Sequence, residues 1–147
     1  MDFDGEYGAS TWDWVAEQVE AYEGSNGAKA ATLRDTGMPI IIITTIGHKS
    51  GLVRKVPLMR VERDGEYAII ASKGGAPEQP GWYHNLIANP NILLQDGPEP
   101  YETVVRLVTG AEREDWWELS ESIFPPYKDY KQKTDREIPV FISESRN

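Results

Sequence analysis

Residues 38–46 constrain the fold of this chain more than any other segment. They read Met-Pro-Ile-Ile-Ile-Ile-Thr-Thr-Ile, a run that is apolar and rich in β-branched side chains. Such a run is typical of a strand whose two faces are both buried, because a half-exposed strand would carry polar residues at every second position. The segment therefore predicts a strand in the core.

A hairpin is expected downstream. Asp64-Gly65 is a strong signal for a two-residue turn, and the segments on either side, 53–63 and 66–73, have the composition of strands. Pairing Arg63 with Glu66 across the turn fixes the register of the two strands. The sequence thus predicts one long antiparallel hairpin.

The remaining chain supplies more strands and several helices at the edges. Strands are also expected over 91–95, 101–109 and 138–143, and helices over 11–23, 80–88, 110–124 and 127–133. About six largely antiparallel strands with peripheral helices favour a mostly β, α+β domain built as a small barrel. A doubly wound parallel sheet is disfavoured, because helices and strands do not alternate regularly. Residues 1–37 are interpreted as an N-terminal amphipathic helix with its connector, and residues 38–147 as the barrel domain.

Composition excludes several classes of protein. A chain of 147 residues with 39% hydrophobic residues can bury one core of ordinary domain size. There are no cysteines and only two histidines, so disulfides, thiolate sites and a polyhistidine metal centre are not expected. No apolar run approaches the roughly 20 residues that a membrane span needs, and the acidic N-terminus is unlike a secretory signal. These features predict a cytoplasmic protein without a metal site.

Charge is distributed unevenly along the chain. The net charge of −9 disfavours nucleic acid and anionic membranes as partners. Residues 1–23 carry seven acids and no base, whereas residues 46–75 carry six bases and three acids. This basic island is either a seat for a small polyanion, such as a phosphorylated cofactor, or a set of solvated charges on strand faces.

Two loops combine glycines with cations. Gly47-His-Lys-Ser-Gly51 is followed by Arg54-Lys55, and Ser72-Lys-Gly-Gly75 ends a predicted strand. Glycine lets backbone N–H groups point outward, and Lys and Arg add charge-assisted donors, so each loop can hold an anion. Neither loop matches the P-loop pattern. Because both are expected at the same end of one sheet, they predict a phosphate-binding site.

Aromatic residues leave a choice open at three places. Trp82, within Gly81-Trp-Tyr-His-Asn85, can wall a ring-shaped cofactor, or it can be a core residue of a helix. Tyr127 and Tyr130 are three residues apart, so a helical turn brings them to one face, where they either close over an apolar substrate or pack on the barrel. The tryptophans of the N-terminal helix can meet a membrane surface or the protein's own core. Its acidic polar face favours the core, with at most weak peripheral membrane contact.

Six short motifs occur in an order that is familiar from a known family. They are Ile42-Ile-Thr-Thr-Ile-Gly-His-Lys-Ser-Gly51, Pro57-Leu58, Ser72-Lys-Gly-Gly-Ala-Pro77, Trp82-Tyr-His-Asn-Leu86, Asn89-Pro90, and Tyr127-Lys-Asp-Tyr130 through Thr134-Asp-Arg-Glu-Ile-Pro139. Together they cover about residues 38–143 and resemble the deazaflavin-dependent nitroreductase family of actinobacteria, whose members use reduced coenzyme F420.

The resemblance implies a split β-barrel that binds the deazaflavin in a groove and passes a hydride from its C5 to a small electron-poor acceptor, such as a quinone, a nitroaromatic or an activated enone. It implies contacts to the phosphate and polyglutamate tail from Lys49, Ser50, Arg54, Lys55, Lys73, Gly74 and Gly75, and contacts to the deazaflavin from Pro57, Leu58, Met59, Trp82 and Asn85. The residues implied to face the acceptor are Ser72, which also borders the cofactor, Tyr127 and Tyr130. These three, or solvent, would supply the proton that follows the hydride. A homodimer is left open.

Three positions depart from the family pattern. His48 stands where relatives usually carry a cation, and Met59 and Phe124 replace tyrosines of the nitroimidazole-reducing members. The acceptor pocket is therefore expected to be more apolar, which argues against nitroimidazole reduction. Three rival functions remain open at this point: an FMN-binding oxidoreductase of the same fold, a non-catalytic deazaflavin carrier or sensor, and a structural interaction module.

Overall fold

The computed structural model describes residues 3, 5–10, 12–33, 37–75 and 77–144. The strands are β1 (Thr32–Leu33), β2 (Met38–Ile46), β3 (Val53–Met59), β4 (Glu62–Arg63), β5 (Glu66–Ile70), β6 (Asn91–Gln95), β7 (Pro100–Val108) and β8 (Val140–Ser143). The helices are α1 (Asp13–Gly24), the short 3₁₀ helix η2 (Lys73–Gly75), α2 (Gly81–Ala88), α3 (Gly110–Ile123) and α4 (Pro126–Lys133).

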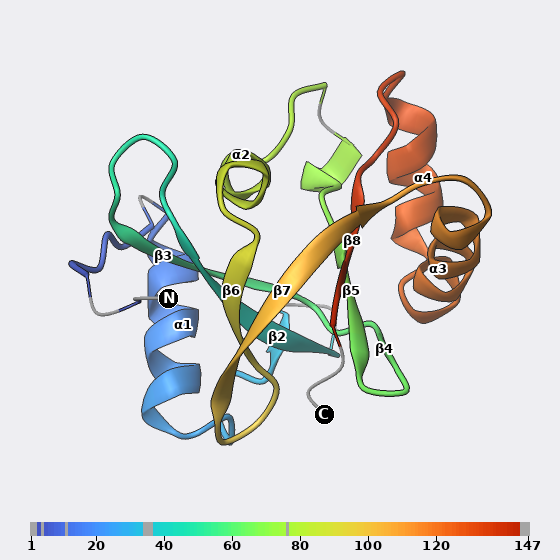
Figure 1. The fold of residues 1–147 in the computed structure, drawn as a ribbon. Helices are drawn as coiled ribbons and strands as arrows, with labels where there is room; N and C mark the ends of the chain where they lie inside the picture. Colours follow the sequence, from blue (N-terminus) through green and yellow to red (C-terminus); the bar gives the residue numbers. More distant parts are fainter. Residues whose placement is uncertain (1–2, 4, 11, 34–36, 76, 145–147) are drawn as a thin grey trace.

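These strands form one curved sheet. They lie in the order β1-β2-β6-β7-β8-β5-β4, with β3 paired to β2, and each of these pairs is antiparallel. Figure 1 shows α1 on one side of the sheet, and α3 and α4 on the other. This confirms the expected split β-barrel with peripheral helices. The structure adds the two-residue strand β1 to the six that were predicted, and it divides the predicted strand over 53–63 into β3 and the two-residue strand β4.

Strand β2 is buried on both faces, as its sequence predicts. Residues 40–45 are all buried. Ile41 and Ile43 belong to a cluster with side chains of β6 and β7, whereas Ile40 and Ile42 pack against side chains of α1. The absence of polar alternation in this strand therefore reflects apolar neighbours on each side.

The prediction of one long hairpin over 53–73 is wrong in part. The turn and its register are as predicted, with Arg63 opposite Glu66, but the hairpin ends at β4 and β5. Upstream, β3 pairs with β2 from Ile40–Met59 to Ile46–Val53, and downstream β5 pairs with β8. Strand β3 instead lies beside the long apolar strand β2 over seven residue pairs, so tertiary pairing overrides the local turn signal.

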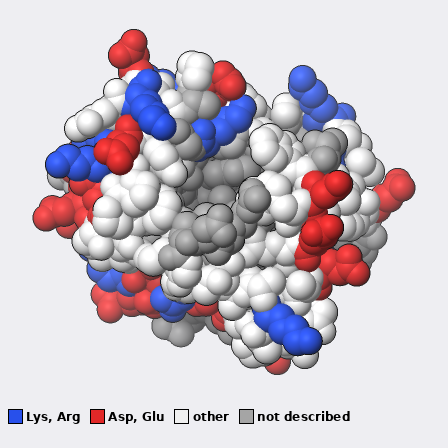
Figure 2. All heavy atoms as spheres, turned by 180° about the vertical axis from the view of Figure 1, so that it is seen from behind, with Lys and Arg blue, Asp and Glu red and all other residues white. Residues whose placement is uncertain are grey.

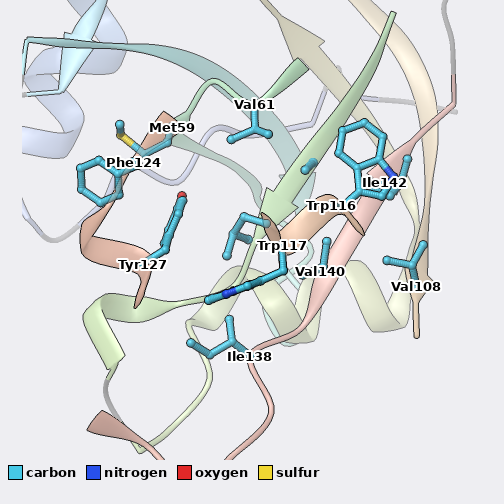
Figure 3. Close-up of a cluster of buried hydrophobic side chains, with 12 residues drawn as sticks. Met59, Val61, Val108, Trp116, Trp117, Phe124, Tyr127, Ile138, Val140 and Ile142 are labelled. Atoms are coloured by element: carbon cyan, nitrogen blue, oxygen red, sulfur yellow. The ribbon is translucent and has the colours of Figure 1, made fainter. Parts of the chain in front are cut away.

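Helices α3 and α4 close one end of the barrel. Trp116 and Trp117 of α3 are each 2% exposed and pack with Tyr127 of α4 against the side chains of β5 and β8. Figure 3 shows this cluster, in which the Tyr127 hydroxyl points toward Met59 and Phe124. The helix α3 is also tied to the chain before β8, because the buried Arg113 guanidinium donates to the Ile138 carbonyl at 2.7 Å.

The N-terminal segment packs on the barrel and borders β3. The Val53 N–H donates to the Glu6 carbonyl at 2.8 Å, the Gly8 N–H donates to the Val53 carbonyl at 2.8 Å, and a parallel bridge joins Tyr7 to Val53. The α1 helix begins at Asp13 rather than near residue 11, and Trp12 before it is 67% exposed. Among the described residues, no helix combines the length and the apolar character that crossing a bilayer requires.

Tyr22 joins α1 to the turn between β6 and β7. Its ring is 2% exposed, and its hydroxyl accepts a hydrogen bond from the Gly97 N–H at 2.7 Å. Tyr22→Phe is expected to lower the free energy of unfolding by about 1–2 kcal/mol, because the Gly97 N–H loses its partner. Urea unfolding measures this change. Tyr83→Phe removes a hydroxyl without a hydrogen bond in the described part of the chain, and an equal loss in that variant would contradict the assignment.

Candidate cofactor pocket

A pocket of about 760 Å³ opens between the N-terminal segment, β3, the start of α2 and helix α4. Figure 2 shows the molecule from behind, hollowed on this face, with Lys and Arg side chains along part of the rim. Every residue implied to face the acceptor lines the pocket, as do most of the implied cofactor residues: Lys49, Ser50, Arg54, Lys55, Pro57, Leu58, Met59, Ser72, Lys73, Trp82, Asn85, Tyr127 and Tyr130. The structure thus brings together side chains from positions 49 to 130.

Strand β3 supplies the longest wall of the pocket, because among the described strands it pairs with β2 alone. On its unpaired side the strand borders the pocket, and every residue from Arg54 to Met59 lines it. Pro57 fits such a position, since a proline cannot donate a hydrogen bond to a second neighbouring strand. The stretch runs from cationic to apolar, so the pocket has a charged end and an apolar end.

The basic island divides into two groups in the structure. Four of its six cations line the pocket: Lys49, Arg54, Lys55 and Lys73. The other two lie elsewhere. Arg60 pairs with Asp96 at 2.8 Å, and Arg63 lies 4.2 Å from the centre of the Trp116 ring. The six cations therefore divide between the pocket and sites outside it, and binding of a polyanion by the pocket group stays a prediction.

Three of the four pocket cations are held by the chain itself. Lys55 Nζ lies 2.8 Å from both carboxylate oxygens of Glu23, and Lys73 Nζ lies 3.2 Å from Glu78. The Arg54 guanidinium donates to the carbonyls of Gly8 and Ala9 at 2.8 and 3.1 Å. Carbonyls orient Arg54 without neutralising its charge. Lys49 is exposed and has no ion pair within the described residues.

Asn85 holds the first glycine loop in place. Its amide oxygen accepts from the His48 N–H at 2.9 Å and lies 2.8 Å from His48 Nδ1, and its Nδ2 donates to Thr45 Oγ1. Asn85 is 6% exposed, so its polar atoms are committed to its own chain. It borders the pocket, and the contacts point to a role in positioning residues 47–51 against α2.

Trp82 belongs to the pocket and to the core. Its ring packs with Phe141 at a centroid distance of 6.5 Å, and the side chain also lines the cavity. The two roles that the sequence left open are therefore compatible, because one face of an indole can cover the core while another part borders the cavity.

Gly75 was expected to contact the cofactor, but in the structure it packs against α4. It is buried, and a Cβ there would lie 2.9 Å from the Tyr130 carbonyl oxygen. It does not line the pocket, whereas Lys73 in the same 3₁₀ helix does. The glycine lets η2 approach α4 closely, so we assign it to packing and not to cofactor contact. Gly74 lies between these two residues in η2.

The apolar end of the pocket is formed by Met59, Phe124, Tyr127 and Tyr130. The Phe124 ring lies 5.0 Å from that of Tyr127, which lies 6.1 Å from that of Tyr130. Tyr127 is 4% exposed, and burial raises the pKa of its hydroxyl. Its phenol therefore stays protonated at working pH and can donate a hydrogen bond. Tyr130 is half-buried.

Sequence analysis missed one wall of the pocket. Gly8, Ser10, Trp12, Trp14 and Val15 line it, although residues 1–37 were interpreted as a part separate from the barrel. The paired tryptophans were the available signal. Their pattern indicates an apolar contact, but a contact with residues more than 30 positions away leaves no periodicity in the sequence.

Comparison with known proteins shows the family. The family model of the F420H(2)-dependent quinone reductases matches residues 14–145. The chain belongs to this family. The F420H(2)-dependent quinone reductase Rv1261c of Mycobacterium tuberculosis is 34% identical over 129 residues, which is 85% of each chain. The match confirms the predicted resemblance, an F420H2-dependent reductase as the enzyme class, and coenzyme F420 as the cofactor.

Two solved structures are similar to the chain. The F420-H2-dependent reductase FDR-A is 53% identical, with a TM-score of 0.68 over 72% of this chain and 94% of that one. A chain described as a domain-swapped dimer is 48% identical, with a TM-score of 0.71 over 92% of this chain and all of that one. The split-barrel fold is thus shared with an F420-dependent reductase.

The residues present fit a deazaflavin with an anionic tail. The pocket volume lies within the range of roughly 300–1,000 Å³ that holds cofactor-sized ligands. Arg54 and Lys49 place uncompensated positive charge at one end, which suits a phosphate and carboxylates. Leu58 and Trp82 supply apolar surface for a planar ring system.

Proposed function

We propose that this chain transfers a hydride from reduced coenzyme F420 to a quinone-type acceptor. In this proposal the cationic end of the pocket binds the phosphate and glutamate tail, and Pro57, Leu58, Met59 and Trp82 border the deazaflavin. Ser72, Tyr127 and Tyr130 face the acceptor. The observation that carries the proposal is the shape of one pocket, whose cationic end and apolar aromatic end are joined along β3.

The apolar end favours a quinone over a polar nitro compound. Met59, Phe124 and Tyr127 offer apolar surface for a flat ring, and none of these three side chains carries a charge to meet a nitro group. The Tyr127 hydroxyl has no hydrogen bond within the described residues, so it can donate to a quinone carbonyl oxygen. An activated enone offers one such carbonyl, where a quinone has two, and is a second acceptor class for the same site.

The chain contributes orientation, exclusion of water and a proton. When bound, reduced F420 supplies the hydride, and a quinone that accepts it with one further proton leaves as the hydroquinone. Tyr127 is suited to hydrogen-bond the acceptor oxygen as negative charge develops there, because burial disfavours its own ionisation. Tyr130 is closer to solvent, so it can pass on its proton and regain one from water.

An acceptor screen tests the proposed function. Purified protein is mixed with F420H2 and menadione, and the return of oxidised-cofactor absorbance is followed. Saturable turnover with menadione supports the proposal. Binding of F420 without turnover across quinones, nitroaromatics and enones would indicate a carrier or sensor. Yellow FMN that co-purifies, with no binding of F420, would indicate the FMN-dependent alternative.

Tyr130→Phe is expected to lower the turnover number about tenfold, because general acid assistance to the reduced acceptor is lost. The dissociation constant for F420 should stay the same, since the tail and ring contacts are made elsewhere. Stopped-flow turnover and a fluorescence titration measure the two quantities. Tyr83→Phe, outside the pocket, is the control. Unchanged turnover in Tyr130→Phe would leave solvent as the proton source.

We also propose that the chain forms a homodimer. Its similarity to a solved chain that is described as a domain-swapped dimer supports this proposal. Light scattering on purified protein at several concentrations gives the mass of the assembly. A monomer mass at every concentration would contradict the proposal.

A further inference from the structure

The N-terminal helix places an anion on the cationic end of the pocket. Glu23, in the last turn of α1, holds the Nζ of Lys55 with both of its carboxylate oxygens at 2.8 Å. The side chains of Lys55 and Glu23 are 23% and 33% exposed, so water screens the pair incompletely. The Tyr7 ring, 5.1 Å from the Lys55 Nζ, covers part of it. Lys55 therefore has a close anionic partner before any ligand arrives.

Charges of both signs lie near this pair, because Glu20 and Arg54 both act on the neighbouring Tyr7 hydroxyl. Burial and the carboxylates of Glu23 and Glu20 raise the pKa of the Tyr7 hydroxyl, whereas Arg54 lowers it. Glu23 contacts the pocket lysine directly, whereas Glu17, in the same helix, is exposed and has no ion pair within the described residues. The position of Glu23 is therefore specific among the acids of α1.

The pair reduces the positive charge that is available to a ligand. Of the Lys and Arg residues that line the pocket in the described part of the chain, Lys55 and Lys73 are paired with carboxylates. Arg54 and Lys49 keep their charge, because Arg54 contacts neutral carbonyls and Lys49 has no ion pair there. Two uncompensated cations match the phosphodiester and one carboxylate of a first glutamate, whose second carboxylate can stay in solvent. Each further carboxylate must compete with Glu23 for Lys55.

We infer that Glu23 is a specificity-determining residue that sets the length of acidic tail the pocket accepts. The inference rests on the proposed function and deepens it. Cofactor forms with a short glutamate tail are bound by Arg54 and Lys49 without disturbing α1. Longer tails gain contact with Lys55 only when they displace the Glu23 carboxylate, so the site gains little affinity from the added glutamates.

Glu23→Gln tests this inference through equilibrium binding, measured by quenching of tryptophan fluorescence. Three probes are titrated: the 5-deazaflavin nucleoside without phosphate or glutamates, F420 with one glutamate, and F420 with a long tail. The variant is expected to bind the long-tailed form about three- to fivefold more tightly than wild type does, the size of a partly screened charge interaction. Affinity for the nucleoside should not change.

Controls separate this effect from general charge and from folding. Glu17→Gln removes the same charge from α1 away from Lys55, and it should leave all three affinities unchanged. In a Lys55→Gln background, Glu23→Gln should no longer improve binding of the long-tailed form. Thermal unfolding verifies that each variant is folded, and Glu23→Ala, which also removes the charge, replaces Glu23→Gln with the same expected result if that variant is not.

The outcomes distinguish a failure of the inference on Glu23 from a failure of the proposed function. If wild type binds neither form of F420, the proposed function fails. If wild type binds F420 but Glu23→Gln improves the nucleoside and the long-tailed form equally, or improves neither, the inference on Glu23 is overturned while the proposed function stands. An equal improvement in Glu17→Gln would also overturn it.

Discussion

Replacing Arg54 by alanine is expected to raise the dissociation constant for F420 about 10- to 100-fold, the loss typical of charge-assisted hydrogen bonds to an anion. Arg54 lines the pocket, and the carbonyls of Gly8 and Ala9 orient its guanidinium while leaving its charge available. Lys55→Ala should have a smaller effect, because Lys55 is already paired with Glu23. Fluorescence titration of both variants against F420 gives the comparison.

Arg54 also contacts the N-terminal segment, so weaker binding of F420 by Arg54→Ala has two possible causes. One is loss of the contact to the tail, and the other is a change in the shape of the pocket. Arg54→Lys keeps the charge and loses the fork geometry that contacts both carbonyls, and it should recover part of the affinity. The nucleoside without a tail should bind the wild type and Arg54→Ala with similar affinity. If Arg54→Ala weakens the nucleoside as much as F420, the guanidinium acts through the shape of the pocket and the tail contact is refuted.

Gly75→Ala is expected to lower the free energy of unfolding by about 2–4 kcal/mol, through left-handed backbone strain and a close main-chain contact. Gly75 has φ of +81°, and an added Cβ would lie 2.9 Å from the Tyr130 carbonyl oxygen. The Cβ position is fixed by the backbone of residue 75 and the oxygen belongs to the main chain, so neither can turn aside. The added Cβ should also displace Tyr130, so turnover with menadione should fall.

Urea unfolding and the turnover assay measure the two effects of Gly75→Ala. The matched control is Gly24→Ala, because nothing lies within 4 Å of a Cβ there. This control should be neutral in both measurements. A Gly75→Ala variant as stable as wild type would mean that η2 and α4 can separate without cost, and the assignment of Gly75 to packing would be wrong.

The sequence predicts those features of the fold that depend on neighbouring residues better than those that depend on residues far apart in the chain. The burial of β2 on both faces and the turn at Asp64-Gly65 each depend on residues that are adjacent in the sequence, so both were predicted. The partner of β3 was not predicted, because β3 pairs with β2 and no turn signal in the adjacent residues specifies that strand. The local turn signal at Asp64-Gly65 extends only to β4 and β5.

The same limit applies to the pocket. Most of the implied residues gather there because the order of the motifs carries family information. The ion pair of Lys55 with Glu23, 32 positions apart, and the wall formed by Trp12 and Trp14 depend on how α1 packs. No spacing rule connects these residues, so only the folded structure reveals that half of the pocket's positive charge is already neutralised.

The backbone contacts of residues 6–8 with Val53 have a consequence for handling the protein. They saturate the outer N–H and C=O of Val53, at the end of a strand that otherwise has one neighbour. Bare β edges invite other molecules to add a strand and aggregate. Shortened versions that begin after this segment would expose that edge together with the apolar lining of the cavity, and their tendency to precipitate would reflect the missing cover rather than a defective barrel.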